Sequence, residues 1–261
     1  MDEVSEQSAF QFKAWGKRLW RRVIDFVAPP KCLACREAVL EPASLCLSCW
    51  ANLKHIDAPY CNVLGTPFAY DQGEGAVSPA ALADPPNWER ARAAVAYDEA
   101  SRGLVHALKY RDIMEAGLLM ARLMARAGRP VIQEADVIIP VPLHRFRLWS
   151  RRFNQATFLA QQISRQFAKP YLTDVLLRNK TSRSQVGLSF DERRKNVAKV
   201  FHVTPEGIGH ITGRRILLVD DVLTTGATAG SCAAVLKKAG AARVDVLTFA
   251  LVLEPKRPHI E

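Results

Sequence analysis

Ile216-Leu-Leu-Val-Asp-Asp-Val-Leu-Thr-Thr-Gly-Ala-Thr228 is the stretch that decides the fold. Its first four residues are all apolar, which is typical of a strand buried on both faces of a parallel sheet. From Thr224 the chain continues in small residues and then in a helical pattern that runs to about Lys238. The stretch therefore predicts a strand, a turn and a helix, with the carboxylates of Asp220 and Asp221 at the carboxyl end of the strand.

Apolar runs and helical patterns alternate along most of the chain beyond residue 88. The expected strands are residues 93–97, 137–141, 171–177, 199–203, 216–220 and 244–253. The expected helices are residues 101–110, 114–127, 154–167 and 228–239. Such alternation predicts an α/β fold, with a mostly parallel central sheet flanked by helices. No internal repeat is visible in the sequence.

The turn after the two acids is a candidate binding site, because ligands of open α/β sheets bind at the carboxyl ends of the strands. Gly226 permits a positive φ or a close approach of the backbone. The N–H groups that open the following helix attract a phosphate. The two carboxylates would repel that phosphate, so we expect them to face sugar hydroxyls or a Mg²⁺ ion. This separation of roles indicates a phosphosugar.

The string from Val219 to Thr228 resembles the phosphoribosyl pyrophosphate (PRPP) signature of type I phosphoribosyltransferases. The resemblance implies a type I phosphoribosyltransferase-like fold, in which Asp220 and Asp221 hold the ribose 2′- and 3′-hydroxyls as the catalytic pair. It also implies that the 5′-phosphate lies on the turn formed by Thr224, Thr225, Gly226, Ala227 and Thr228. The alternative is a strand-to-helix turn with Ser/Thr caps and a chance pair of acids.

Other residues are placed where this family binds the rest of PRPP. The strand that begins at Val137 leads into a loop placed like the pyrophosphate loop, where Leu143 and His144 would offer backbone N–H groups. Lys109 and Arg151 are candidates for contacts with the pyrophosphate oxygens. For His144, Lys109 and Arg151 a solvated surface position is the alternative. The polar residues 178–188 lie where such enzymes carry a loop that closes over the ribose, or else form a plain surface excursion.

Four of the six cysteines form two C-x2-C pairs near the N-terminus, Cys32 with Cys35 and Cys46 with Cys49. Two such pairs can place four thiolates around one tetrahedral ion, which favours structural zinc with no open catalytic position. A module of about 30 residues has a small core, so the metal would supply much of its folding free energy. An iron–sulfur cluster and four buried thiols without metal are the alternatives.

Over about residues 20–255 the chain resembles the ComF family of competence-associated proteins. The matching pieces are Pro29-Pro-x-Cys-x-x-Cys35, Cys46-x-x-Cys-Trp50, Leu108-Lys-Tyr110, Pro140-Val-Pro-Leu-His144, Arg151-x-Phe-Asn-Gln155, Gln185-x-x-Leu188 and Arg193-x-x-Asn196. We expect a basic helix and a four-cysteine zinc module at residues 10–65, a linker at 66–88 and a phosphoribosyltransferase-type domain at 89–255. Where the family often has Cys-x-x-Cys-Gly, this chain has Cys61-Asn-Val-Leu-Gly65, so a second metal pair is not expected.

The net charge of +10 favours a polyanionic partner. The leading hypothesis is a PRPP-binding protein that transfers the phosphoribosyl group, with Mg²⁺, to an unidentified acceptor and is linked to DNA uptake. The alternative is a non-catalytic zinc protein that binds single-stranded DNA in uptake, recombination or repair. Arginines 145, 147, 151 and 152 lie near Phe146 and Trp149, a mixture that suits single strands and would also suit a small polyphosphate.

Residues 10–27 have the spacing of a basic amphipathic helix, which either touches a membrane or nucleic acid or docks its aromatic stripe on the protein. No apolar run approaches the roughly 18 residues of a membrane span, and the N-terminus lacks the basic segment of a signal peptide. We therefore expect a cytoplasmic protein without stable membrane insertion.

Overall fold

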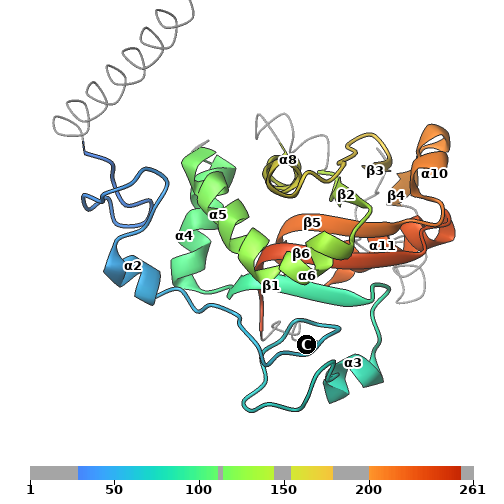
Figure 1. Cartoon of the computed structure of the whole chain (residues 1–261), viewed down its shortest axis with the longest axis horizontal. Helices are drawn as coiled ribbons and strands as arrows, with labels where there is room; N and C mark the ends of the chain where they lie inside the picture. Colours follow the sequence, from blue (N-terminus) through green and yellow to red (C-terminus); the bar gives the residue numbers. More distant parts are fainter. Residues whose placement is uncertain (1–28, 111–113, 144–153, 179–199, 254–261) are drawn as a thin grey trace, which may run out of the picture. The chain divides into compact units, whose positions relative to one another are not determined.

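The computed structural model describes residues 29–110, 114–143, 154–178 and 200–253 (Figure 1). The chain forms two compact units, Met1–Ala51 and Asn52–Glu261. The first unit carries one described helix, α2 (Leu47–Ala51). The predicted limits 10–65, 66–88 and 89–255 stay a prediction, and the boundary between the compact units lies at residues 51 and 52.

The second unit is built on a four-stranded sheet in the order β1-β6-β5-β2. These strands are β1 (Arg90–Ala96), β6 (Arg243–Leu251), β5 (Arg215–Leu223) and β2 (Val137–Pro140). All three neighbouring pairs are parallel, which confirms the predicted parallel sheet. The apolar residues of β5 and β6 are almost completely buried, because helices cover both faces of these central strands.

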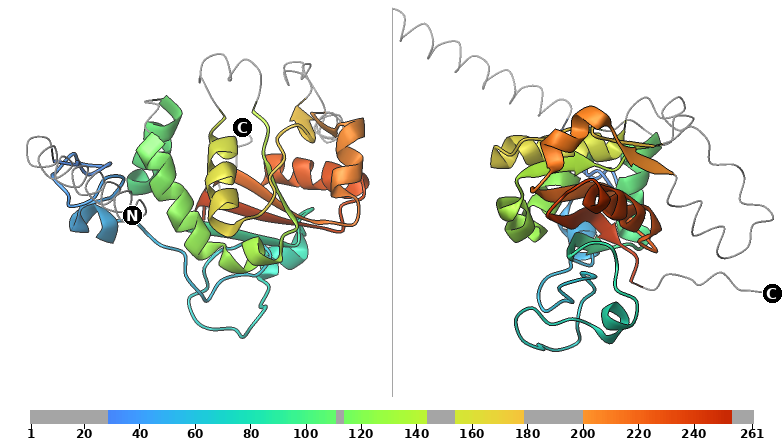
Figure 2. Two further views of the ribbon diagram at one scale, coloured as in Figure 1. Left: turned by 45° about the horizontal axis from the view of Figure 1, so that its top comes forward. Right: turned by 90° about the vertical axis from the view of Figure 1, so that its right-hand side faces the viewer.

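Helices α5 (Met114–Ala127) and α8 (Gln155–Phe167) pack side by side against the sheet (Figure 2). Gly117 makes this close packing possible, because a Cβ at that position would clash with the Phe158 ring. Helix α4 (Glu99–Tyr110) packs on α5. Helix α6 (Arg129–Glu134) comes directly after α5 in the chain. Helix α11 (Ala227–Lys238) packs on β5 and β6, where its residues Ala229, Ala233 and Leu236 join the hydrophobic core.

Most predicted elements are confirmed. The prediction of one continuous strand at residues 171–177 is wrong. Tyr171 forms a single parallel bridge with Ile138, and the chain then bends before β3 (Leu176–Arg178) pairs with β4 (Phe201–Val203). The bend is held by the Thr204 hydroxyl, which donates to the Asp174 carbonyl (3.1 Å). The sequence analysis did not expect the short helices α2, α3 (Pro79–Ala83), α6 and α10 (Pro205–Ile211), because each has only one or two turns.

Residues 52–83 lie beside β1 (Figure 1). Ile56 donates a backbone hydrogen bond to Ala94, Ala96 donates one to Lys54, and His55 forms an antiparallel bridge with Val95. This segment also contains a short helix, α3 (Pro79–Ala83). Backbone contacts therefore join the start of this segment to strand β1.

The expected basic helix at residues 10–27 and most of the loop at 178–188 lie outside the described residues. None of the helices in the described parts of the chain is long and apolar enough to cross a bilayer.

Candidate functional site

Asp220 and Asp221 lie near the carboxyl end of β5, as the sequence predicts. The Asp220 carboxylate accepts the backbone N–H of Asp221 at 2.8 Å. Burial, together with the negative charge of Asp221, raises the pKa of Asp220 to about 8. An acid in this state takes up or releases a proton near neutral pH, which is a common property of functional sites.

Lys109, in the last turn of α4, forms an ion pair with Asp221. The Lys109 side chain is 20% exposed and that of Asp221 is 12% exposed, so the pair is largely shielded from water. The sequence singled out both residues but did not predict that they touch. The structure brings Lys109 to the acid pair, and its contact with pyrophosphate oxygens stays a prediction.

The turn after β5 leads into α11 through a glycine. Gly226 has a φ of +78° and is the N-cap of α11, so the first N–H groups of this helix have no partner from an earlier turn. The Thr225 hydroxyl accepts the N–H of Ala227 at 3.4 Å. Thr224, Thr225 and Thr228 are exposed, so their hydroxyls are accessible to a ligand.

Trp88 supports this turn from behind, a contact that the sequence did not predict. The position of a Cβ on Gly226 lies 2.7 Å from the Trp88 ring, so only glycine fits there. The Trp88 indole N–H donates to the Val63 carbonyl at 2.9 Å. Asn87 donates to the Gly230 carbonyl in the first turn of α11 (3.3 Å). The segment before β1 thus fixes the start of the turn and of the helix.

The loop after β2 begins beside the acid pair. Val141 donates a backbone hydrogen bond to Val219, the residue before Asp220, at 2.9 Å. The half-buried Leu143 follows two residues later. Asn154, which sequence reasoning did not select, caps α8 and donates to the Val141 carbonyl at 3.1 Å. Since His144, Arg151 and the neighbouring arginines lie outside the described residues, their roles stay predictions.

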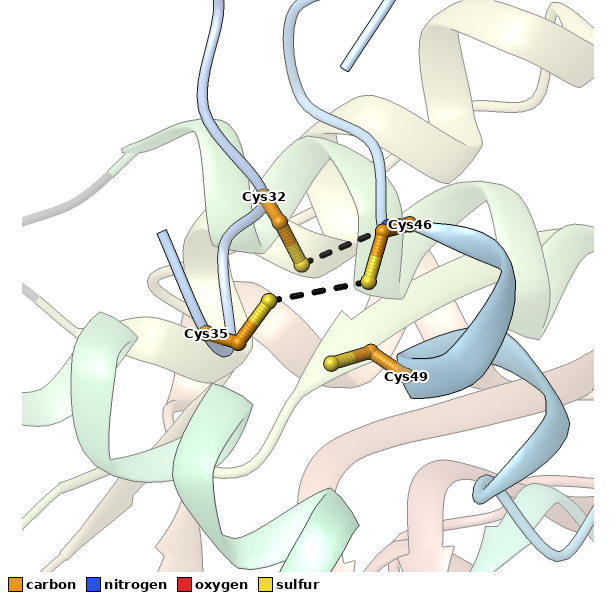
Figure 3. Close-up of side chains that lie close together, drawn as sticks. All are labelled: Cys32, Cys35, Cys46 and Cys49. Carbon is orange, nitrogen blue, oxygen red and sulfur yellow. Dashed lines mark hydrogen bonds between the residues drawn. The ribbon is translucent and has the colours of Figure 1, made fainter. Parts of the chain in front are cut away.

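The four cysteines of the first unit point toward one another (Figure 3). Their sulfurs all lie within 4.8 Å of one another, and those of Cys35 and Cys46 are 3.6 Å apart. Four thiolates around one zinc ion would be separated by about 3.8 Å, given Zn–S bonds of about 2.3 Å and tetrahedral angles. The arrangement therefore fits a structural zinc ion.

The thiols of the cluster differ in how easily they ionise. Burial tends to raise the pKa of Cys32, but hydrogen bonds from the backbone of Cys35, Cys46 and Ala34 outweigh it and lower the pKa to about 6. Burial and the neighbouring thiols raise the pKa of Cys49 to about 12. A bound cation would favour the thiolate form of all four groups.

Both parts of the chain are similar to described protein families. A double zinc ribbon domain matches residues 23–81, and a phosphoribosyl transferase domain matches residues 154–260. The latter match, together with the parallel sheet flanked by helices, identifies the second unit as a type I phosphoribosyltransferase-like fold.

Two relatives match most of the chain. Competence protein F of Haemophilus influenzae is 31% identical over 222 residues, which cover 83% of this chain and 94% of that protein. The DNA utilization protein YhgH of Escherichia coli K12 is 29% identical over 220 residues, or 82% and 87% of the two chains. Among solved structures, orotate phosphoribosyltransferase from Aeropyrum pernix superposes with a TM-score of 0.35 and 16% identity, over 61% of this chain and 80% of that one.

Proposed function

The chain belongs to the family of competence protein F, and on that premise we propose that its second unit binds PRPP together with Mg²⁺ and transfers the phosphoribosyl group to an acceptor. One observation carries this proposal. A pair of acids at the end of the central strand β5 leads into a glycine turn that opens α11. An acidic edge and the N-terminus of a helix therefore lie next to each other, an arrangement that suits a phosphorylated sugar.

The turn holds the 5′-phosphate in this proposal. The N–H groups of the first residues of α11 point out of the helix end, and the helix dipole adds partial positive charge there. The exposed hydroxyls of Thr224, Thr225 and Thr228 add further donors. Gly226 lets the turn lie against Trp88, because a side chain at this position would clash with the indole ring.

Asp220 and Asp221 accept hydrogen bonds from the ribose hydroxyls. Carboxylate oxygens and diphosphate oxygens are the ligands that Mg²⁺ prefers, so the acid pair fits a magnesium complex of the sugar. The bound Mg²⁺ would neutralise charge on the pyrophosphate and make it a better leaving group. Lys109 holds the Asp221 carboxylate in place before the ligand arrives.

In the transfer step, the bond between the anomeric carbon and pyrophosphate breaks and a bond from that carbon to the acceptor's nucleophile forms. The protein has no need of a covalent intermediate. Its residues position the sugar and stabilise the charges of an oxocarbenium-like state.

A second candidate function is the binding of single-stranded DNA without turnover of PRPP. It is favoured by the names of the relatives, which refer to competence and DNA utilization, and by the net charge of +10. In either case the zinc module has a structural role, and we place the protein in the cytoplasm.

Isothermal calorimetry tests the proposal. Wild-type protein should bind PRPP with Mg²⁺, and Asp221→Asn should lose most of this affinity because it removes a charge from the acid pair. Asp84→Asn, at the exposed end of α3, is the matched control and should bind as the wild type does. Equal affinity of the wild type and Asp221→Asn would refute the assignment of the acid pair.

A salt titration separates the two candidates. DNA binding through several phosphates weakens steeply as salt rises, because each contact releases condensed counterions. Single-strand binding that is strongly salt-dependent and unchanged in Asp221→Asn, without PRPP binding, would support the second candidate instead.

A further inference from the structure

Two segments of the chain fold in the same way, although their sequences show no repeat. We call residues 30–51 the first ribbon and residues 59–83 the second ribbon. In the first ribbon, backbone hydrogen bonds run from Cys32 to Glu37, from Arg36 to Cys32 and from Val39 to Pro30. In the second ribbon they run from Cys61 to Thr66, from Gly65 to Cys61 and from Phe68 to Pro59. Every donor and every acceptor of the second set follows its counterpart at the same constant offset along the chain.

The backbone turn at the centre of each ribbon is also the same. Arg36 and Gly65 both have a positive φ, 70° and 72°. An antiparallel bridge closes each hairpin, Lys31 with Ala38 and Tyr60 with Pro67, and these two bridges are related by the same offset. The hairpin that carries Cys32 and Cys35 is therefore repeated around Cys61.

The rest of the repeat follows after a slightly longer loop. In the first ribbon the N–H of Cys46 donates to the Cys32 sulfur (3.3 Å), and α2 begins at the next residue. In the second ribbon the N–H of Ser78 donates to the Cys61 sulfur (3.2 Å), and α3 begins at the next residue. Ser78 thus occupies the position of Cys46. The offset between these two residues exceeds the offset of the hairpin by the extra length of the loop.

This correspondence identifies what stands at the four metal-ligand positions of the second ribbon. Cys61 corresponds to Cys32, and the counterparts of Cys35, Cys46 and Cys49 are Leu64, Ser78 and Ala81. Leu64 packs against the hydrophobic core, and Ala81 is only 3% exposed. The Ser78 hydroxyl is used as the N-cap of α3. One sulfur and two apolar side chains cannot form the tetrahedral site of a zinc ion.

In the second ribbon, side chains of strand β1 and of the residue before it contact the loop that corresponds to the loop between Cys32 and Cys35 in the first ribbon. Arg92 donates to the backbone carbonyl of Asn62 (2.9 Å) and to its side-chain oxygen (2.6 Å), and its guanidinium lies 4.4 Å from the centre of the Tyr60 ring. Trp88 donates to the Val63 carbonyl. Asn62 and Val63 are the two residues that follow Cys61, so the loop between the first two ligand positions is fixed by protein contacts.

We propose that the second ribbon is a metal-free repeat of the first, stabilised by Arg92 and Trp88, and that the chain binds a single zinc ion. This differs from the two ions that the matching double zinc ribbon domain implies. Among the described residues, the cysteines of the first ribbon form the one group of three or more His, Cys, Asp or Glu side chains close enough to share an ion.

Metal analysis of the full-length protein, purified without chelator, tests this proposal. We expect one zinc per chain in the wild type, one in Cys61→Ala and none in Cys49→Ser. Two zinc ions per chain in the wild type, or a loss of zinc in Cys61→Ala alone, would overturn it.

The reverse experiment rebuilds the missing ligands. The triple variant Leu64→Cys, Ser78→Cys and Ala81→Cys should bind a second ion, so that the thiolate-to-cobalt absorption after substitution with Co²⁺ doubles relative to the wild type. If the variant takes up one Co²⁺ as the wild type does, the correspondence of ligand positions is wrong. Both readouts concern metal content and are independent of PRPP binding.

Discussion

The side-chain nitrogen of Lys109 lies 2.5 Å from the Asp221 carboxylate and joins the last turn of α4 to the end of β5. The pair is mostly shielded from water, so the removal of the lysine leaves a poorly solvated charge on Asp221. We expect Lys109→Met to lower the free energy of unfolding by about 1–3 kcal/mol, less than the full cost of breaking a completely buried pair. Urea denaturation measures this loss, and Lys109→Arg, which keeps the charge, should recover part of it. An unchanged midpoint in Lys109→Met would show that the ion pair adds nothing to stability.

The raised pKa of Asp220 predicts how PRPP binding depends on pH. An ionised carboxylate is the better acceptor for ribose hydroxyls and the better partner for Mg²⁺. Since the pKa of Asp220 is about 8, we expect the affinity for PRPP with Mg²⁺ to increase as the pH rises from 7 to 9. Calorimetry across this range measures the change. Asp220→Asn should show a much flatter profile, and a flat profile in the wild type would mean that Asp220 is already ionised at pH 7.

The raised pKa of Asp220 has the opposite effect on folding stability, which decreases as the pH rises. The folded state binds the Asp220 proton more tightly than the unfolded state, whose pKa is near the ordinary value of 3.8. The contribution of Asp220 to folding stability is therefore fully present below about pH 4 and is lost as the pH rises toward 8. Asparagine does not ionise, so Asp220→Asn lacks this pH-dependent loss of stability. We therefore expect the variant to gain stability relative to the wild type between pH 5 and pH 8. A thermal unfolding series of both proteins would contradict this if their difference stayed constant.

The sequence was sufficient to predict the strand, turn and helix of the candidate site. The uninterrupted apolar run before Asp220 and the small residues after it determine this local structure, and the helix at residues 114–127 was predicted with its observed limits. Parallel pairing of β5 with its neighbours followed from the alternation of strands and helices. These features depend on residues that are close together in the sequence.

The contacts that complete the site join residues far apart in the sequence. Lys109 meets Asp221 and Trp88 meets Gly226 only because the sheet order places β1, β6 and β5 side by side. The sequence showed that residues 61–65 lack a second pair of metal ligands, but it did not show that the second ribbon has the same fold as the first. Three of its four ligand positions no longer carry cysteine, and the offset between the two ribbons changes after the hairpin. The similarity therefore persists in hydrogen bonds and not in residue types.

Zinc removal should affect the two units differently. The first ribbon has few buried side chains and depends on four thiolates, so a strong chelator should unfold it. The second unit has its own core, and its ribbon is held by Arg92 and Trp88. We therefore expect chelated protein to keep most of its helical circular dichroism and its affinity for PRPP. Loss of the whole structure on chelation would show that the second unit depends on the metal.

Gly226 should be the least replaceable residue of the phosphate turn. A side chain at this position would adopt a φ of +78° and would also meet the Trp88 ring, with its Cβ 2.7 Å from the nearest ring atom. The backbone strain alone costs about 1–3 kcal/mol. To relieve the clash with the ring, the turn must move away from Trp88. This movement displaces the N–H groups that would hold the 5′-phosphate.

We therefore expect Gly226→Ala to reduce the affinity for PRPP at least tenfold in calorimetry. Gly209→Ala is the matched control, because Gly209 lies within α10 and a Cβ there meets nothing within 4 Å. Trp88→Phe separates the two causes. The substitution replaces the indole behind Gly226 by a smaller ring and removes the hydrogen bond to Val63. It should therefore relieve the clash in the Gly226→Ala, Trp88→Phe double variant while leaving the φ strain. If Gly226→Ala bound PRPP as tightly as Gly209→Ala, neither the glycine nor the ring behind it would be needed to shape the turn.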